Sequence, residues 1–234
     1  GTEGRRARGG ARRGGESARR GGAAGSGERR GRAGVQTAVR AGASGHRGSR
    51  PREAVTPPDT DVALALDELV ARCRSAGPLS TEHDPAWPSP CELDAPDADG
   101  RVAWAPVLRD AFDLLDPLAE TLDVVVHPAV VTFYGRWYSD GFRTAAPEGE
   151  VNLIGVWNED DTLRLQQNLL GHALQQRRRR QPLTFFFALT EEDSETVLSV
   201  DNARGTVVLE VPGTDRREDV APSLATFLHT LAPR

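Results

Sequence analysis

The first 58 residues contain almost no side chain that could join a hydrophobic core. They are rich in Arg and Gly, and almost none of their apolar residues is larger than Ala or Val. A segment of this composition cannot bury enough surface to offset the entropy lost when a chain becomes ordered. We therefore predict a disordered Arg/Gly-rich arm over residues 1–58, or an extension that the mature protein lacks. The folded domain is confined to residues 59–234.

Charge divides the chain at nearly the same place. Residues 1–54 hold 14 Arg against 4 Glu, whereas residues 55–234 hold 15 Arg against 30 Asp and Glu. The strongly acidic body disfavours nucleic acid and anionic lipid as its main partner. Arg and Gly repeats can bind single-stranded nucleic acid, but the arm lacks the interleaved aromatic residues that supply stacking. We expect no nucleic-acid partner.

Cysteine usage and hydropathy indicate the compartment. Cys73 and Cys91 are isolated, with no C-x-x-C pair and no His at zinc-finger spacing, which favours a reducing compartment. No run of 18 apolar residues occurs, and the N-terminus has no apolar signal-peptide core. We expect a cytoplasmic protein.

The first half of the body predicts three helical regions. Thr60 can cap a helix that Gly77 ends, and an extended piece is expected at 102–104. Apolar spacing over 107–121 predicts two helical pieces, with the break at Pro117. Another helix is expected to follow His127-Pro128 and to run through Trp137.

The second half is patterned more clearly. A strand is expected over 151–157, and Asn158 can cap a long helix with acids in its first turn, Arg in its last turn and Pro182 after its end. Further elements are predicted as strands at 183–189, 196–200 and 206–211 and a helix at 222–231. Together these elements predict an α+β fold, with a mainly antiparallel sheet packed against helices.

No catalytic or metal-binding motif stands out. The His residues are scattered, and no nucleophile elbow, Walker loop or dinucleotide fingerprint occurs. The acidic runs 159–161 and 191–193 are either solvated turns and caps or a charged docking face. A hydrolase that uses these carboxylates is the least favoured reading. We expect a non-enzymatic protein with no metal and no cofactor.

The aromatic cluster near residue 134 is expected to serve two purposes. At helical spacing Phe133 and Trp137 share one face and are predicted to be buried, which leaves Tyr134 and Tyr138 on another face. Aromatic residues with a polar tip suit the edge of an interface. We predict that both tyrosines contact a partner.

The segment from Trp157 to His172 carries a resemblance. Its runs Trp157-Asn158-Glu159-Asp160-Asp161 and Leu165-Gln166-Gln167-Asn168-Leu169-Leu170-Gly171-His172 resemble the signature helix of the Syd family, also called SecY-interacting protein. Other runs agree in order, among them Pro88-Ser89-Pro90-Cys91, Thr132-Phe133-Tyr134 and Gln181-Pro182-Leu183-Thr184-Phe185-Phe186. The resemblance spans roughly residues 61–234.

The resemblance implies a single α+β domain related in fold to the SUKH superfamily, with a concave acidic surface. That surface is expected to bind the basic cytosolic loops of SecY, the central subunit of the protein-export channel, as a regulator or quality check of its assembly. Membrane association, at the cytoplasmic face of the bacterial inner membrane, is expected only through SecY. The alternative is a SUKH-like immunity module that neutralises a toxin. The predicted partner-binding residues are Tyr134, Tyr138, Trp157, Glu159, Asp160, Asp161, Glu191, Glu192 and Asp193.

Overall fold

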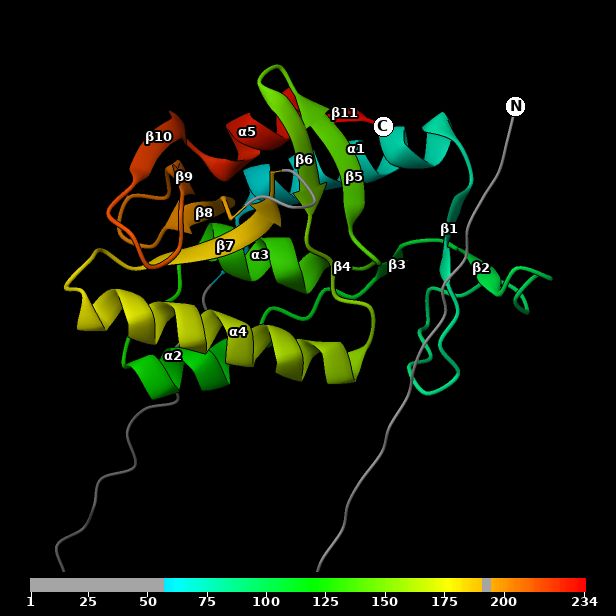
Figure 1. The fold of residues 1–234 in the computed structure, drawn as a ribbon, viewed down its shortest axis with the longest axis horizontal. Helices are drawn as coiled ribbons and strands as arrows, with labels where there is room; N and C mark the ends of the chain where they lie inside the picture. The colour runs from blue at the N-terminus through cyan, green and yellow to red at the C-terminus, as the bar shows by residue number, and fades with distance from the viewer. Residues whose placement is uncertain (1–56, 191–194) are drawn as a thin grey trace, which may run out of the picture. The chain divides into compact units, whose positions relative to one another are not determined.

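The computed structural model describes residues 57–190 and 195–234, and their helices and strands surround one large sheet (Figure 1). The elements follow in the order α1 (Thr60–Ala76), β1 (Leu79–Glu82), β2 (Arg101–Trp104), β3 (Val107–Leu108), α2 (Asp116–Leu122), α3 (Pro128–Arg136), β4 (Trp137–Tyr138), β5 (Phe142–Ala146), β6 (Gly149–Leu153), α4 (Glu159–Arg178), β7 (Thr184–Leu189), β8 (Val197–Asp201), β9 (Val207–Glu210), β10 (Arg217–Ala221), α5 (Leu224–Thr230) and β11 (Ala232–Pro233). Apart from residues 57 and 58, the predicted arm lies outside the described residues.

The main sheet has seven strands in the order β10-β9-β8-β7-β6-β5-β11. Every neighbouring pair in it is antiparallel. Two small antiparallel pairs, β1-β2 and β3-β4, lie outside it. The predicted α+β fold with a mainly antiparallel sheet is therefore confirmed.

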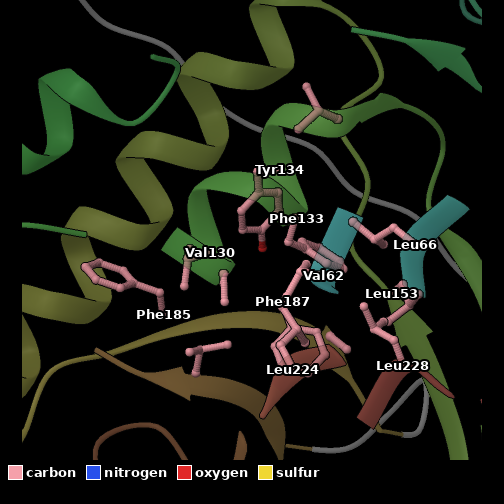
Figure 2. Close-up of a cluster of buried hydrophobic side chains, with 14 of the residues drawn as sticks. Val62, Leu66, Val130, Phe133, Tyr134, Leu153, Phe185, Phe187, Leu224 and Leu228 are labelled. Atoms are coloured by element: carbon pink, nitrogen blue, oxygen red, sulfur yellow. The ribbon is translucent and has the colours of Figure 1, made fainter. Parts of the chain in front are cut away.

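Helices cover both faces of the sheet at β7. Successive side chains of a strand point to opposite faces of the sheet, so neighbouring phenylalanines of β7 contact different helices. On one face the Phe187 ring packs edge-on against Phe133 of α3 and Phe227 of α5, and its centre lies 5.5 and 5.8 Å from the centres of those two rings. On the other face Phe186 meets the ring of His172 from α4. Figure 2 shows the first of these layers, where α1, α3, α5 and β7 bring their apolar side chains together.

Local sequence signals account for the helix boundaries. The Asp59 side chain accepts hydrogen bonds from the backbone N–H groups of Asp61 and Val62, so Asp59 caps α1 rather than Thr60. Pro117 lies in the first turn of α2 instead of breaking a helix, because its fixed φ and missing N–H suit that position. The predicted helix at 107–115 is wrong, since residues 107–108 form β3.

The end of α3 also differs from expectation. The helix stops at Arg136, and Trp137 and Tyr138 continue as β4 paired with β3. A Cβ on Gly135 would lie 2.5 Å from the Ala111 carbonyl oxygen. This close approach lets the backbone at 109–111 bond to the last carbonyls of α3, which holds the next two residues in a strand.

Candidate partner-binding surface

The first turn of α4 is held by reciprocal capping. Asn158 Oδ1 accepts a hydrogen bond from the Asp161 N–H at 2.9 Å, and Asp161 Oδ2 accepts one from the Trp157 N–H at 3.0 Å. The carboxylates of the first turn also face the positive end of the helix dipole. The sequence-predicted cap at Asn158 is confirmed, and the Asp161 side chain is committed to it.

Glu159 is bound to cations and donors of the protein itself. Its carboxylate accepts hydrogen bonds from Arg109 Nη2 at 3.1 and 3.2 Å and from the Tyr138 hydroxyl. Arg109 also stacks over the Tyr138 ring, and its side chain is only 8% exposed. Partial burial, followed by the hydrogen bond to Glu159, raises the pKa of Tyr138 to about 12. Much of the Glu159 charge is therefore already balanced.

Asp160 differs from both neighbours. It is exposed, and its side chain has no hydrogen-bond or ion-pair partner among residues 57–190 and 195–234. Of the three predicted acids of this turn, Asp160 presents the freest negative charge to an incoming partner.

The long connection between β1 and β2 lies beside this turn (Figure 1). Ser89 Oγ donates to the Trp157 carbonyl at 2.5 Å, and Asn158 Nδ2 donates to the Pro88 carbonyl at 2.9 Å. The Arg164 guanidinium lies 3.7 Å from the centre of the Trp87 ring. Residues 83–100 hold five acidic residues and no Arg, so the connection adds negative charge next to α4.

A groove of about 760 Å³ opens between the β1 side and the strands β5 and β6. Asp140, Glu150, Arg143 and Arg234 lie along it, together with Asn152 and Leu189. Partial burial and the nearby Asp161 carboxylate raise the pKa of Asp140, against a hydrogen bond from Thr81. Asp140 thus connects the groove to the start of α4. We define the acidic surface as the carboxylates of Asp84, Asp140, Glu159, Asp160 and Asp161.

The comparisons with known proteins agree on one family. The family model described as Syd protein (SUKH-2) matches residues 66–233. A Protein Syd of Pseudoalteromonas atlantica is 45% identical over 179 residues, which is 74% of this chain and 96% of that relative.

The chain belongs to the Syd family.

Other relatives support the same assignment. A Protein Syd of Hahella chejuensis is 40% identical over 174 residues, or 74% of this chain and 90% of the relative. A Protein Syd of Alteromonas mediterranea is 36% identical over 176 residues, or 74% of this chain and 96% of the relative. The Syd match includes α4, the β1-β2 connection and the groove.

Two of the predicted partner-binding residues are buried in this Syd domain. Tyr134 is 1% exposed and its hydroxyl donates to the Phe186 carbonyl at 2.7 Å, so its predicted place at an interface edge is wrong. Burial alone raises the pKa of Tyr134. Trp157 is 9% exposed and packs edge-on against Trp104. Both residues belong to the hydrophobic core.

Of the predicted residues outside α4 that remain, one reaches the surface and three lie outside the described part of the chain. Tyr138 is half-buried and reaches the surface beside Glu159. Glu191, Glu192 and Asp193 lie outside the described residues. Among the residues that the structure does describe, no helix is long and apolar enough to span a bilayer, and no group of three or more His, Cys, Asp or Glu could hold a metal ion.

Three residues in or beside this surface were not predicted from the sequence. Asp140, Trp87 and Arg109 are distant in sequence from their partners on α4, by as many as 77 positions for Trp87 and Arg164, and become neighbours of α4 only through folding. Trp87 carried a usable signal, since a Trp inside a loop rich in Pro and Asp is an exposed candidate for binding. Arg109 and Asp140 carried none.

A second cluster of polar side chains links α4 to the sheet through hydrogen bonds. His172 Nε2 lies 3.2 Å from both Thr184 Oγ1 and Glu210 Oε1, and Arg217 Nη2 bonds Glu210 Oε2 at 2.7 Å. Burial by itself would raise the pKa of Glu210, but hydrogen bonds from His172, Thr184 and Arg217 lower it to about 2. His172 and Glu210 are 6% and 5% exposed. The cluster therefore stabilises the packing of α4 on the sheet, and its residues do not line the groove beside Asp140.

Proposed function

We propose that this Syd domain binds the SecY subunit of the protein-export channel through its acidic surface, without catalysing a reaction. Cytosolic loops of membrane proteins carry an excess of Lys and Arg. The described residues hold 27 acidic side chains against 15 Arg, so a basic loop is attracted over long range. The observation that carries the proposal is Asp160, an exposed carboxylate of the acidic surface that has no side-chain partner in the described part of the chain.

The shape of the surface suits a loop rather than a flat partner. The groove beside Asp140 is long enough to be lined by residues from β1, β5, β6, β7 and the C-terminus. Its mixed lining, with Leu189 and Leu79 beside Arg143 and Glu150, offers both apolar contacts and charge. An extended basic segment could lie in the groove while its cations meet Asp140 and Asp160.

The proximity of Arg164 to Trp87 supports the choice of a guanidinium as the cation that this surface would bind. A guanidinium over a Trp ring gains about 0.5–1 kcal/mol at an exposed site. Arg109 over Tyr138, with its centroid distance of 4.7 Å, repeats the arrangement. Two guanidinium groups of the protein itself therefore lie on aromatic rings, and the Arg109–Tyr138 pair also contacts the Glu159 carboxylate; an arginine of the partner loop would need a similar environment.

The test is a binding titration of the full chain against SecY in a lipid nanodisc. Asp160→Lys is compared with Glu218→Lys, which makes the same charge change at an exposed position of β10. We expect about a tenfold loss of affinity for Asp160→Lys, with little change for Glu218→Lys. The wild-type affinity should fall as salt rises, because the screening length shortens.

Other outcomes have distinct meanings. Equal losses in both variants indicate that net charge alone drives binding and that Asp160 is not at the interface. No binding to SecY, together with tight binding to a toxin encoded beside the gene, supports the SUKH-like immunity module instead. A separate assay of protein export would test whether SecY binding restrains or assists assembly of the channel.

A further inference from the structure

The C-terminal end of α4 is as basic as its start is acidic. Residues 177–180 are four consecutive arginines, and all four are exposed. The turn between β9 and β10 lies beside them, because Gln181 Nε2 donates to the Thr214 carbonyl at 2.6 Å and Arg179 pairs with Asp215 at 3.1 Å. That turn adds another exposed arginine. We call this set the basic end; its members are Arg177, Arg178, Arg179, Arg180 and Arg216.

Most of these cations are not used by the fold. Arg177 donates to the Leu122 carbonyl and Arg179 pairs with Asp215. Within residues 57–190 and 195–234, the side chains of Arg178, Arg180 and Arg216 have no hydrogen-bond or ion-pair partner. Cations in the last turn of a helix favour its dipole, but Arg216 is not on the helix. Helix stability alone does not account for the cluster.

Exposed aliphatic side chains accompany the arginines. Leu174 lies one turn before Arg177 and Arg178 on α4 and is 41% exposed. Val125 is 74% exposed and follows the end of α2, whose Leu122 carbonyl accepts the Arg177 hydrogen bond. Arginines around aliphatic side chains are typical of surfaces that lie at a bilayer interface, where the charges meet phosphates and the aliphatic groups enter the acyl boundary.

We propose that the basic end docks on an anionic lipid surface. The remainder of the domain is acidic and is repelled by such a surface, so only one orientation is favourable. Helix α4 has 20 residues and is therefore about 30 Å long. Its start can bind a membrane protein while its end rests on the lipid beside that protein. This goes beyond the proposed function and departs from the expectation that the membrane is reached only through SecY.

A nucleic acid is the other polyanion that five arginines could bind. Sequence-tolerant binding of single strands relies on aromatic rings for stacking. The exposed apolar side chains at the basic end are Leu174 and Val125, which suit an acyl boundary and cannot stack with bases. Lipid is therefore the partner that the observations favour.

The experiment uses the full chain with Val125→Cys carrying an environment-sensitive fluorophore. Native Cys73 and Cys91 are 5% and 0% exposed, and burial raises the pKa of both thiols, so labelling favours the new site. A second protein carries the label at Leu64→Cys on α1, where the side chain is 57% exposed. We expect a blue shift at Val125 with vesicles of phosphatidylcholine and phosphatidylserine, no shift with phosphatidylcholine alone, and no shift at Leu64.

Arginine variants separate the basic end from the Arg-rich N-terminal segment. Arg178→Gln with Arg180→Gln and Arg216→Gln should lose most of the Val125 shift at saturating lipid. The matched change Arg5→Gln with Arg6→Gln and Arg8→Gln removes the same charge and should keep the shift. Arg178→Lys with Arg180→Lys and Arg216→Lys should keep it too, because the charge at the basic end is retained. Circular dichroism checks that each variant is folded.

The proposal is overturned by equal shifts at Val125 and Leu64, or by an unchanged shift in the Gln variant of the basic end. It is also overturned if a single-stranded oligonucleotide, and not the vesicles, changes the Val125 emission through the same arginines, which would assign the basic end to nucleic acid. No SecY is present, so the result does not depend on the proposed function.

Discussion

The Arg109 guanidinium carbon lies 4.7 Å from the centre of the Tyr138 ring, and the same guanidinium bonds Glu159. The contact joins the chain after β3, the strand β4 and the first turn of α4. It places a nearly buried cation beneath the acidic surface.

Replacing Arg109 by Met should therefore have opposite effects on stability and binding. The free energy of unfolding should fall by about 1–2 kcal/mol, the sum of a cation–π contact and an exposed ion pair. Affinity for a basic partner should rise a few-fold, because the Glu159 carboxylate is released. Denaturant unfolding and a SecY titration measure the two effects. Weaker binding by folded protein would show that Arg109 itself contacts the partner.

Asp160 and Asp161 should be separable by substitution with Asn. Asp161→Asn replaces the carboxylate that accepts the Trp157 N–H with a neutral amide oxygen, which is a weaker acceptor, and removes a charge from the first turn of α4. Together these losses should cost about 1 kcal/mol of stability. Asp160→Asn should change stability by less than about 0.5 kcal/mol and weaken binding to a basic partner. Thermal unfolding and binding of the two single variants test this. If Asp161→Asn weakens binding more than Asp160→Asn in folded protein, the assignment of roles is reversed.

Tyr134→Phe should affect stability alone. The change removes the hydroxyl that donates to the Phe186 carbonyl and leaves that carbonyl without its partner in a buried layer, at a cost of about 1–2 kcal/mol. Binding per folded molecule should match the wild type, and Tyr138→Phe serves as the surface comparison. A drop in affinity without a drop in stability would place Tyr134 at an interface after all.

Two glycines should respond to Ala in opposite directions. A Cβ at Gly155 would lie 2.3 Å from both the Gly141 nitrogen and the Ser139 carbonyl oxygen, whereas a Cβ at Gly171 meets nothing within 4 Å. Gly155→Ala should cost about 3 kcal/mol or more, because backbone on both sides must move. Gly171→Ala should stabilise α4 by up to about 1 kcal/mol. Paired urea unfolding curves decide the comparison.

The buried Glu210 should make stability depend on acid pH. Its pKa is about 2 in the folded protein, against an ordinary value of 4.5, so its contribution is complete above about pH 4.5 and is lost as pH falls toward 2. The contribution is roughly 3 kcal/mol. Glu210→Gln should lower stability at neutral pH and flatten the loss between pH 4.5 and 2. If the variant loses as much stability as the wild type between pH 4.5 and 2, Glu210 does not make this contribution.

The elements with strong local signals were predicted from sequence. Asn158, the first-turn acids and Pro182 bound α4, and the alternating runs gave β7, β8 and β9. The strands β5 and β10 were not predicted. β5 reads Phe-Arg-Thr-Ala-Ala and β10 reads Arg-Glu-Asp-Val-Ala, and both form because a neighbouring strand supplies their hydrogen bonds.

Of the acidic surface, only the carboxylates on α4 were predicted from the sequence. Helical spacing predicted Phe133 and Trp137 on one buried face and Tyr134 on another, but α3 ends before Trp137, which is half-buried, and the Phe133 and Tyr134 rings pack edge-on against each other. Tyr134 is buried because α1 and β7 both pack against α3. The sequence gives no account of Arg109 or Asp140, because their neighbours are set by tertiary packing. The prediction for Glu191, Glu192 and Asp193 remains a prediction.

The attachment of His172 to Thr184 and Glu210 fixes the rotation of α4 on the sheet, because hydrogen bonds tolerate less sliding than apolar contacts. One residue inserted between Asp160 and His172 turns everything before it by about 100° around the helix axis. Asp160 would then leave the acidic surface although every residue type was kept. We expect insertions and deletions among relatives to collect in the β9-β10 turn, and the stretch from Asn158 to Gln176 to keep a constant length.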